Sequence, residues 1–418
     1  MSAATPVFLI TLSLLAFSEG NPLHSPSAAS LPPASCAPAG DLVLPEGFCA
    51  VAVADGLGRI RQLTVLSNGD AIVASGGSGG RLVLLRDTDG DGRADLRRTI
   101  HDEGGTGVQW HDGWLYFSPD SKVIRWRWQP GALEAAGATE VIVSRLPTGG
   151  HSAKTFAFLG GDSLIVNLGS RTNSCQREDR GYRSPGSDPC TELETRAGLW
   201  LFSASRSGQT PRDGTRFATG LRNAMALAVE PATGRLYAAP HGRDQLTQSW
   251  SYSEALGAEL PSEEFMQVGA GDDFGWPYCY YDHQQGRKVL APEYGGDGRS
   301  TGRCAAAKDP LIGFPGHWAP MGMAFYDASQ FPARYRGGVF ITFRGSWNRA
   351  PLPQEGFRVV FAAFAAPGRP TGEYETFATS REGPTALRPV GLAVGPDGSL
   401  YIADERSGTV FRVMATTR

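Results

Sequence analysis

Two glycine-flanked stretches carry the side chains best suited to acid–base and oxyanion chemistry. Residues 149–155 read Gly-Gly-His-Ser-Ala-Lys-Thr, and residues 220–225 read Gly-Leu-Arg-Asn-Ala-Met. An accessible His151 can act as a general base. The guanidinium of Arg222 offers a rigid fork of donors for a carboxylate or a developing oxyanion, and Asn223 adds a neutral donor and acceptor. Taken singly, His151 can equally be an ordinary loop histidine and Arg222 a surface residue of a turn.

Two further stretches indicate a cation site and an aromatic, basic loop. Residues 240–245 read Pro-His-Gly-Arg-Asp-Gln. A glycine-containing loop of this kind can direct backbone carbonyls inward, and carbonyl oxygens are ligands that Ca²⁺ accepts. Residues 317–320 and 343–349 place two arginines and two tryptophans on loops around one repeat. These tryptophans can also simply fill gaps between sheets.

A separate acidic run resembles the start of a calcium-binding loop. Its carboxylates, which alternate around a central glycine, are Asp87, Asp89, Asp91 and Asp95. The bidentate glutamate expected at the twelfth position is replaced by Arg98. A weak structural Ca²⁺ site and a solvated acidic hairpin tip both explain this run.

The β-strands that must position these residues come from one repeated sequence pattern. Alternating apolar residues around an Asp-Gly or Asn-Gly turn predict a β-hairpin. This pattern occurs at residues 63–75, 108–117, 155–168, 225–239, 321–343 and 390–404. A single small sheet cannot bury both faces, and radial stacking closes the array without long exposed edges. We therefore predict an all-β, six-bladed β-propeller with four-stranded antiparallel blades.

The ends of the chain suggest how the ring closes. An apolar strand at residues 48–54 precedes the first full repeat, and the last strand, 409–413, lies just before the C-terminus. We expect these two strands to share the last sheet. We predict one propeller domain at 41–418, preceded by a secretion signal at 1–20 and a Pro/Ser/Ala-rich tether at 21–40. The apolar run of the signal is too short to span a bilayer.

Cysteine usage and charge indicate the compartment and exclude some partners. The six cysteines form three sequence-local couples, which are Cys36 with Cys49, Cys175 with Cys190, and Cys279 with Cys304. This pattern favours structural disulfides in a secreted or periplasmic protein, although buried thiol pairs and a lipidated Cys36 are alternatives. The net charge is −3 with dispersed basic residues, so we expect no nucleic-acid binding. We also expect no transmembrane segment in the mature chain.

The motifs also carry a resemblance as a set. In chain order they are Leu-Pro-Glu-Gly-Phe at 44–48, Gly-Gly-His at 149–151, Gly-Leu-Arg-Asn at 220–223, Gly-Arg-Asp at 242–244, Phe-Gly-Trp-Pro-Tyr-Cys at 274–279, Pro-Glu-Tyr-Gly-Gly-Asp-Gly at 292–298, His-Trp-Ala-Pro at 317–320, Gly-Ser-Trp-Asn-Arg at 345–349 and Arg-Pro-Val-Gly at 388–391. This set resembles the soluble quinoprotein glucose/sorbosone dehydrogenases, a family that includes the fungal pyranose dehydrogenase domain. The resemblance implies a six-bladed propeller that binds pyrroloquinoline quinone and Ca²⁺ and oxidises a sugar hydroxyl.

The resemblance also implies roles for individual residues. His151 matches the catalytic base, Arg222 and Asn223 match residues that hold the quinone, and Arg349 matches a cofactor-binding arginine. The backbone oxygens of Gly242 and Arg243 match the Ca²⁺ ligands. Because the quinone carries three carboxylates, its site needs fixed cations. The candidates are Arg222, Arg344, Arg349, Arg406 and Lys154. The electrons would leave to an external acceptor such as a quinone, a dye or a cytochrome.

Two departures from the family pattern bear on substrate choice. Arg344 stands where relatives tend to have histidine, and Lys154 stands where arginine is usual. Both keep or add positive charge, so the expected cofactor site is preserved while the sugar is left open. A non-catalytic binding propeller and a Ca²⁺-dependent lactonase are the alternative functions. The lactonase would need acidic and Asn side chains around a central metal, whereas the candidates here are cationic.

Overall fold

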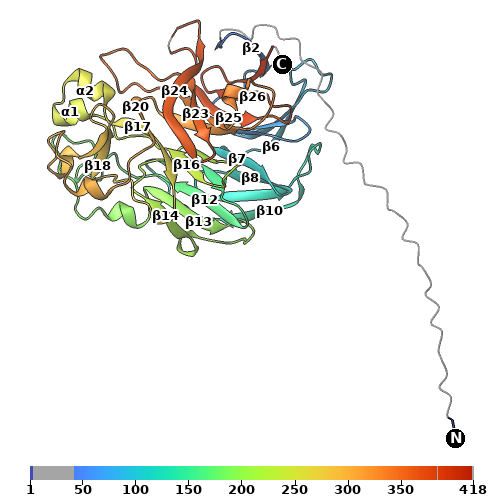
Figure 1. Cartoon of the computed structure of the whole chain (residues 1–418), viewed down its shortest axis with the longest axis horizontal. Coiled ribbons are helices and arrows are strands. Elements are labelled where there is room, and N and C mark those ends of the chain that lie inside the picture. The colour runs from blue at the N-terminus through green and yellow to red at the C-terminus, as the bar shows by residue number, and fades with distance from the viewer. Residues whose placement is uncertain (3–41, 384, 417–418) are drawn as a thin grey trace. The chain divides into compact units, whose positions relative to one another are not determined.

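The computed structural model describes residues 1–2, 42–383 and 385–416. From residue 42 onward these residues form a six-bladed β-propeller, as predicted. In Figure 1 the colour passes around the ring from blue through green and yellow to red, so consecutive repeats occupy neighbouring blades. The predicted secretion signal and tether, and with them Cys36, fall on residues 3–41, outside the described part of the chain.

Each blade is an antiparallel sheet whose first strand lines the centre of the ring. Blade 1 contains β3 (Ile60–Val65), β4 (Ala71–Ser75), β5 (Leu82–Arg86) and β6 (Leu96–His101). Blade 2 contains β7 (Gly107–His111), β8 (Trp114–Ser118), β9 (Val123–Arg127) and β10 (Ala136–Val143). Blade 3 contains β11 (Phe156–Phe158), β12 (Ser163–Leu168), β13 (Gly198–Ser203) and β14 (Thr215–Thr219).

The second half of the chain supplies the other three blades. Blade 4 contains β15 (Ala226–Val229), β16 (Leu236–Ala239), β17 (Ser262–Val268) and β20 (Ile312–Gly316). Blade 5 contains β21 (Pro320–Tyr326), β22 (Gly338–Phe343), β23 (Arg358–Ala366) and β24 (Arg369–Ser380), with β1 (Leu42–Val43) added at its edge. Blade 6 contains β25 (Pro389–Val394), β26 (Leu400–Asp404), β27 (Thr409–Ala415) and β2 (Phe48–Ala54).

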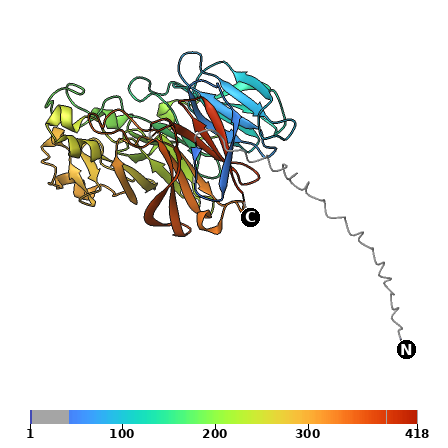
Figure 2. The same ribbon diagram turned by 90° about the horizontal axis from the view of Figure 1, so that it is seen from above.

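The ring closes through β2, as the sequence predicts. This strand pairs antiparallel with β27, with Phe48 opposite Ala415. Figure 2 shows the blue N-terminal strand beside the red strands of the last blade. The Phe48 ring also meets blade 5 edge to face, with ring centroids 4.7 Å from Phe331 and 5.2 Å from Phe377. Such aromatic pairs contribute about 0.5–1.5 kcal/mol each beyond simple burial, so the closure is anchored to two blades.

The six inner strands enclose a central cavity of about 290 Å³. Most of its lining residues are apolar, while Gln62 and Gln109 contribute amide groups and Thr64 a hydroxyl group. None of these lining side chains is ionisable. Acid–base chemistry must therefore lie at an end of the channel, where the loops are.

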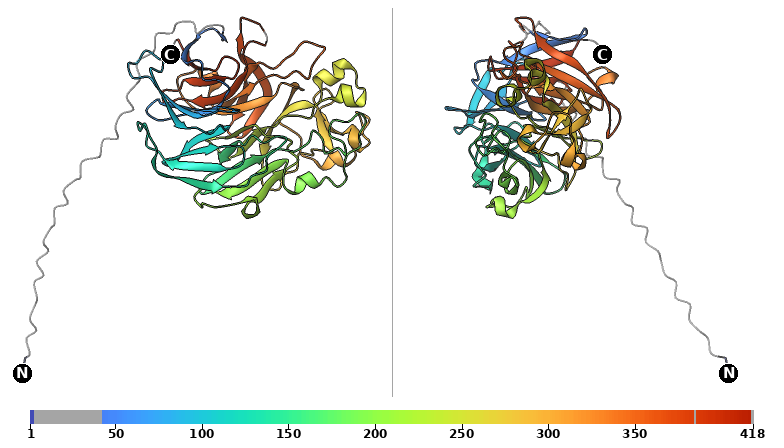
Figure 3. Two further views of the ribbon diagram at one scale, coloured as in Figure 1. Left: turned by 180° about the vertical axis from the view of Figure 1, so that it is seen from behind. Right: turned by 90° about the vertical axis from the view of Figure 1, so that its left-hand side faces the viewer.

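The longest insertions belong to blades 3 and 4. Blade 4 carries α1 (Leu246–Trp250), α2 (Glu254–Glu259) and a hairpin of β18 (Cys279–Asp282) and β19 (Arg287–Leu290), which lie outside the ring in Figures 1 and 3. The short 3₁₀ helices are η1 (Thr191–Glu194), η2 (Pro211–Asp213), η3 (Pro292–Tyr294), η4 (Gly302–Ala306) and η5 (Ala333–Tyr335). Over the described residues, no helix has the length and apolar character needed to cross a membrane.

Two of the three predicted disulfides are confirmed. Cys175 is bonded to Cys190 in the blade 3 insertion, and Cys279 is bonded to Cys304 in the blade 4 insertion. The third predicted bridge joins Cys49 to Cys36, and Cys36 lies outside the described residues. The confirmed bridges therefore fasten the two longest loops, which neighbour the candidate site.

Candidate active site

The predicted chemical residues lie at one end of the propeller because of how the blades are wound. Antiparallel pairing brings the start of a blade's first strand and the end of its second strand to the same edge. The stretches at this edge are 149–155 before β11, 220–225 before β15, 240–245 after β16, 317–320 before β21 and 344–349 after β22. Three neighbouring blades, 3, 4 and 5, thus contribute these loops to a single end of the channel.

His151 is half-buried and is held in one orientation. Its Nδ1 lies 2.9 Å from the backbone carbonyl of Ser170, and its backbone N–H donates to the same carbonyl at 3.0 Å. Because a carbonyl only accepts, the hydrogen sits on Nδ1 and the lone pair on Nε2. Burial, reinforced by the neighbouring Arg222 cation, lowers the pKa of His151 to about 3. A neutral imidazole with a free Nε2 is the form that a general base requires.

Asn223 lies beside His151 because residue 169 is a glycine. A Cβ atom at Gly169 would lie only 2.7 Å from His151 Cβ and 2.8 Å from Asn223 Oδ1. Asn223 Oδ1 accepts a hydrogen bond from Asn167 Nδ2 at 3.0 Å, which fixes the amide. The Asn223 NH₂ group is consequently directed away from Asn167 and is available as a donor.

Arg222 is buried and makes four hydrogen bonds. It donates to the carbonyl of Asn173 at 3.0 Å, to Asn173 Oδ1 at 3.1 Å, to the carbonyl of Gly242 at 2.7 Å and to Asp244 Oδ2 at 3.0 Å. A guanidinium has five N–H donors, so one N–H of Nη1 is left for another acceptor. The backbone carbonyl of Arg222 accepts from Ser170 N at 2.7 Å, which links it to the His151 loop.

Asp244 is the anion around which the loops converge. Its Oδ2 accepts from Arg180 at 2.8 Å as well as from Arg222, and its Oδ1 accepts from Asn348 at 2.8 Å. Burial raises the pKa of Asp244, but Arg222 and Arg180 outweigh burial and hold the pKa well below its usual range. The carboxylate is therefore charged and connects loops from blades 3, 4 and 5.

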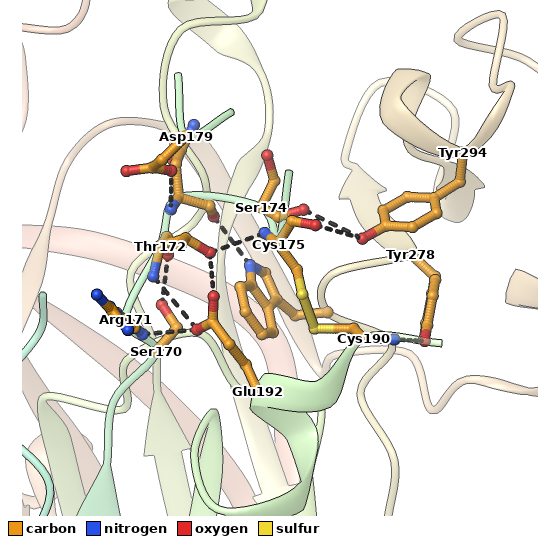
Figure 4. Close-up of a disulfide and its surroundings, with 12 residues drawn as sticks. Ser170, Arg171, Thr172, Ser174, Cys175, Asp179, Cys190, Glu192, Tyr278 and Tyr294 are labelled. Carbon is orange, nitrogen blue, oxygen red and sulfur yellow. Dashed lines mark hydrogen bonds between the residues drawn. A yellow bond between two sulfur atoms is a disulfide. The ribbon is translucent and has the colours of Figure 1, made fainter. Parts of the chain in front are cut away.

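The loop that holds His151 and Arg222 is fastened by a disulfide. Figure 4 shows the Cys175–Cys190 bridge beside Glu192, whose carboxylate accepts the backbone N–H groups of Arg171 and Thr172. The Thr172 hydroxyl in turn accepts from the backbone N–H of Cys175 at 2.9 Å. This network fixes residues 170–173, which supply the acceptors for both catalytic candidates.

The predicted metal loop rests on a buried glutamate. Gly242 N donates to Glu263 Oε2 at 2.9 Å, and Ala319 N donates to Glu263 Oε1 at 3.0 Å. Through these two hydrogen bonds Glu263 joins the loop at residues 240–245 to the start of blade 5 and orients the Gly242 peptide. Burial raises the pKa of Glu263 to about 7.

The Gly242 and Arg243 carbonyls are compatible with a divalent cation. The Gly242 oxygen is shared with Arg222, and the Arg243 oxygen accepts no hydrogen bond from the described residues. The charged carboxylate of Asp244 provides negative charge next to these carbonyls. The Arg243 side chain points into the protein instead, where its Nη2 lies 2.7 Å from the fully buried Glu293. The donor set is thus hard oxygen, as Ca²⁺ prefers.

His241 lies between the two groups of cations. Its Nε2 donates to the carbonyl of Pro320 at 2.8 Å. Burial lowers the pKa of His241 to about 3, and the next largest contributions come from Arg344, Arg222 and His151. Arg344 and Arg222 therefore both lie near the neutral imidazole of His241.

A second group of cations surrounds Glu405 at the same end. The guanidiniums of Arg61, Arg344 and Arg59 lie 3.0, 3.2 and 3.4 Å from its carboxylate. Arg388 joins them, because burial and then the repulsion of Arg344 lower its pKa. In the described part of the chain, the buried Nε atoms of Arg344 and Arg388 have no hydrogen-bond partner. This arginine cluster, made of Arg59, Arg61, Arg344 and Arg388, has more positive charge than Glu405 neutralises, so it suits a polyanionic ligand.

The other predicted cations have different surroundings. Arg349 is buried and donates to the carbonyls of Ala258 and Gly316 and to Glu259. Lys154 is buried and donates to the carbonyls of Pro147 and Ser152, and burial lowers its pKa to about 8. Arg406 is exposed at the rim, with its guanidinium 3.4 Å from the Thr385 carbonyl. Arg349 and Lys154 thus hold loops together, and only Arg406 is open to solvent.

The acidic run of blade 1 forms a turn held by its own carboxylates. Asp87 accepts the N–H groups of Gly90 and Gly92 at 2.7 and 2.8 Å, and Asp95 accepts from Thr88. Carboxylate oxygens of Asp87, Asp89 and Asp95 lie within 4.8 Å of one another, while Asp91 is outside this group. This geometry fits both a weak structural Ca²⁺ site at Asp87, Asp89 and Asp95 and a solvated acidic hairpin tip.

Sequence reasoning missed the roles of the anions and three of the four members of the arginine cluster, since only Arg344 was among the predicted cations. Asp244, Glu263 and Glu405 each neutralise or orient residues from two or more loops, and no spacing in the sequence reveals such partners. Arg61 was missed because it lies within an ordinary inner strand. Arg388 did belong to a recognised motif, Arg-Pro-Val-Gly, and its position just before β25 was the available signal.

The fold and this site define a six-bladed β-propeller whose loops gather histidines and several arginines at one end of the channel. The chain belongs to the TrAA12-like family, whose model matches residues 42–416. This match confirms the resemblance carried by the motifs.

Proteins similar to this chain include two sequence relatives and several solved structures. A "Pyrroloquinoline quinone-dependent sugar dehydrogenase" of Hypocrea jecorina is 21% identical over 405 residues, covering 88% of each chain. An uncharacterized protein of Borreliella burgdorferi is 25% identical over 201 residues, and the match spans about half of it, 48%, and 47% of this chain. Among solved structures, the "Holo form of Pyranose Dehydrogenase PQQ domain" of Coprinopsis cinerea superposes with a TM-score of 0.74 at 20% identity, covering 90% of this chain and 98% of that one.

Proposed function

We propose that this chain is a secreted or periplasmic quinoprotein oxidoreductase that oxidises a hydroxyl group of a pyranose or related sugar. The observation that carries the proposal is that a neutral His151, a buried Arg222 and four arginines around one carboxylate lie at one end of the channel. Among the described residues, His151 Nε2 and one N–H of Arg222 have no hydrogen-bond partner. The names of the relatives supply the cofactor and the substrate class, pyrroloquinoline quinone and a sugar.

The residues present fit this cofactor. Among the described residues, the buried Nε donors of Arg344 and Arg388 have no hydrogen-bond acceptor, and they would hold carboxylates of the quinone. Asn223 and Arg222 would hold its polar edge. The carbonyls of Gly242 and Arg243 would hold Ca²⁺. When bound, the quinone would supply the electrophilic centre that accepts a hydride.

The chain's own residues would then handle the proton and the charge. His151 Nε2 would take the proton of the sugar hydroxyl, and its Nδ1–H bond to Ser170 keeps the ring in the right tautomer. Arg222 would place its remaining N–H against negative charge that develops during the reaction. Asp244 would keep the Arg222 fork fixed, so no reorganisation is needed during turnover. The electrons would pass to an external acceptor.

Reconstitution tests the proposal directly. Adding pyrroloquinoline quinone and Ca²⁺ to the purified chain should give a bound-quinone absorption band and sugar-dependent reduction of a redox dye. Removing Ca²⁺ with a chelator should abolish most of the activity, and Ca²⁺ should restore it better than Mg²⁺, because carbonyl ligands at a flexible loop suit the larger ion. A chain that binds no quinone at micromolar concentration would refute the proposal and leave the non-catalytic propeller.

The pH profile should reflect the lowered pKa of His151. A base whose pKa is about 3, rather than 6.5, stays neutral as the pH falls through 6, so kcat/KM should show no loss with an apparent pKa near 6.5. The same shift has a stability consequence with a defined sign. The unfolded chain binds a proton at His151 below pH 6.5 and the folded chain does not, so folding stability should decline as the pH falls from 6.5 toward 3. His151→Gln should reduce that decline in thermal unfolding measurements.

A further inference from the structure

Trp347 is an exposed aromatic residue on a loop that is otherwise fixed. Its exposed fraction is 64%, and in the described part of the chain only Tyr182 is a comparably exposed aromatic, at 67%. A single exposed apolar side chain is common on protein surfaces. What distinguishes Trp347 is the position of its loop, which is fixed and reaches the candidate site.

The loop is anchored on both sides of Trp347. On the N-terminal side, the backbone N–H groups of Arg344 and Gly345 donate to the carbonyls of Ala319 and Trp318 at 3.0 and 2.8 Å. A Cβ atom at Gly345 would lie 2.4 Å from the Phe357 ring, so only glycine allows this close packing. On the C-terminal side, Arg349 is buried. The tryptophan thus projects from a rigid turn and is not exposed through loop motion.

The anchoring also places Trp347 next to the site. Its neighbour Asn348 donates to Asp244 Oδ1 at 2.8 Å, and Asp244 accepts from Arg222 through Oδ2. Two hydrogen bonds therefore separate the residue after Trp347 from the proposed oxyanion donor. Tyr182 lies on the other loop that reaches Asp244, because Arg180 donates to the same carboxylate at 2.8 Å. The two most exposed aromatics among the described residues thus lie on two loops that both contact the Asp244 carboxylate.

The chemistry of this arrangement matches a sugar ring. A pyranose presents C–H groups on its faces and hydroxyls at its edge. The C–H groups carry partial positive charge and pack well against the negative face of an indole, while the hydroxyls need charged or amide partners. Trp347 offers the face, and Asn348, the next residue, is hydrogen-bonded to Asp244, which also accepts from Arg180, so polar groups belong to the same network of loops. A protein partner would need a larger apolar surface than one tryptophan provides.

We propose that Trp347 is a stacking surface for a pyranose ring of the substrate and sets the affinity for the sugar. The inference rests on the sugar oxidation proposed above. Removing the indole should weaken the sugar complex without changing the cofactor site, whose cations lie on other side chains. The effect should therefore appear in KM and not in kcat or in quinone affinity.

The test compares Trp347→Ala with Trp347→Phe and Leu311→Ala. Leu311 is an exposed apolar residue, at 38%, in the connection to β20, so its truncation controls for loss of surface apolar area. With the quinone-loaded protein and a panel of glucose, galactose and cellobiose, Trp347→Ala should raise KM about ten-fold with kcat within about two-fold, since an aromatic contact of this size is worth roughly that factor. Trp347→Phe should recover most of the affinity, and Leu311→Ala should match wild type.

A second measurement separates this inference from the proposed function. Saturation-transfer NMR of the full chain with the same sugars reports contact with ring C–H protons without any turnover. If the chain binds sugars but oxidises none of them, the proposed function fails, and loss of the signal in Trp347→Ala still supports the stacking surface. An unchanged KM in an active Trp347→Ala enzyme, or an unchanged signal in the NMR experiment, would overturn it.

Discussion

His151→Gln should lower turnover by about 10² to 10⁴, which is the usual contribution of a positioned general base to the rate. Quinone affinity should stay nearly unchanged. The reason is that the arginines and His151 have different proposed roles at the site. The arginines hold the anionic cofactor, and His151 offers a neutral Nε2 whose orientation depends on the Ser170 carbonyl. Glutamine keeps a similar size and can still donate to Ser170, but it cannot take a proton.

The experiment combines a quinone titration with sugar-dependent dye reduction. His111→Gln is the matched control, because His111 lies at the opposite end of its inner strand, β7, and stacks on Phe158 with ring centroids 4.0 Å apart. It should retain wild-type turnover. A His151→Gln enzyme with undiminished kcat would exclude His151 as the base.

Arg222→Ala should weaken quinone binding and turnover together. The change removes a donor to the proposed ligand and the proposed stabiliser of negative charge, and it leaves Asp244 without its buried partner. Breaking a buried ion pair typically costs about 3 kcal/mol, so a fall in the melting temperature should accompany the loss of function. Arg222→Lys should keep the charge but recover little, because an ammonium cannot reproduce the four hydrogen bonds of the fork.

A matched control separates folding from function. Arg412 and Asp397 in blade 6 form a 2.7 Å pair with side-chain exposures of 5% and 21%, close to the 4% and 17% of Arg222 and Asp244. Arg412→Ala should destabilise the chain to a similar extent while its quinone titration stays normal. If Arg222→Ala binds quinone as tightly as Arg412→Ala does, the assigned role of Arg222 is wrong.

The arginine cluster suggests why Arg344 is tolerated where relatives tend to have histidine. Arg344 shares Glu405 with Arg61 and Arg59, so its charge is partly balanced within the protein. An added cation without such a partner would be costly to bury. Glu405 thus lets the cluster carry additional positive charge for a polyanionic ligand without isolating any one guanidinium.

The sequence by itself determined the architecture. The alternation of apolar residues around Asp-Gly and Asn-Gly turns is a local property, and it predicted six blades and the closure of the last blade by β2. The spacing of cysteines predicted the 175–190 and 279–304 bridges for the same reason, since both partners lie in one loop. Local motifs also brought out His151 and Arg222, because glycine-flanked ionisable residues at strand ends are visible without a structure.

Only the tertiary structure decided which charges are paired. Arg59 and Glu405 are 346 positions apart, and Arg222 and Asn173 are 49 apart, so their contacts depend on ring closure and blade stacking. Lys154 and Arg349 are cationic in the sequence as Arg344 is, yet folding supplies the first two with backbone acceptors and leaves the Arg344 Nε without a partner in the described part of the chain. Whether a buried cation is available to a ligand depends on the acceptors that distant segments bring to it, and that information exists only in three dimensions.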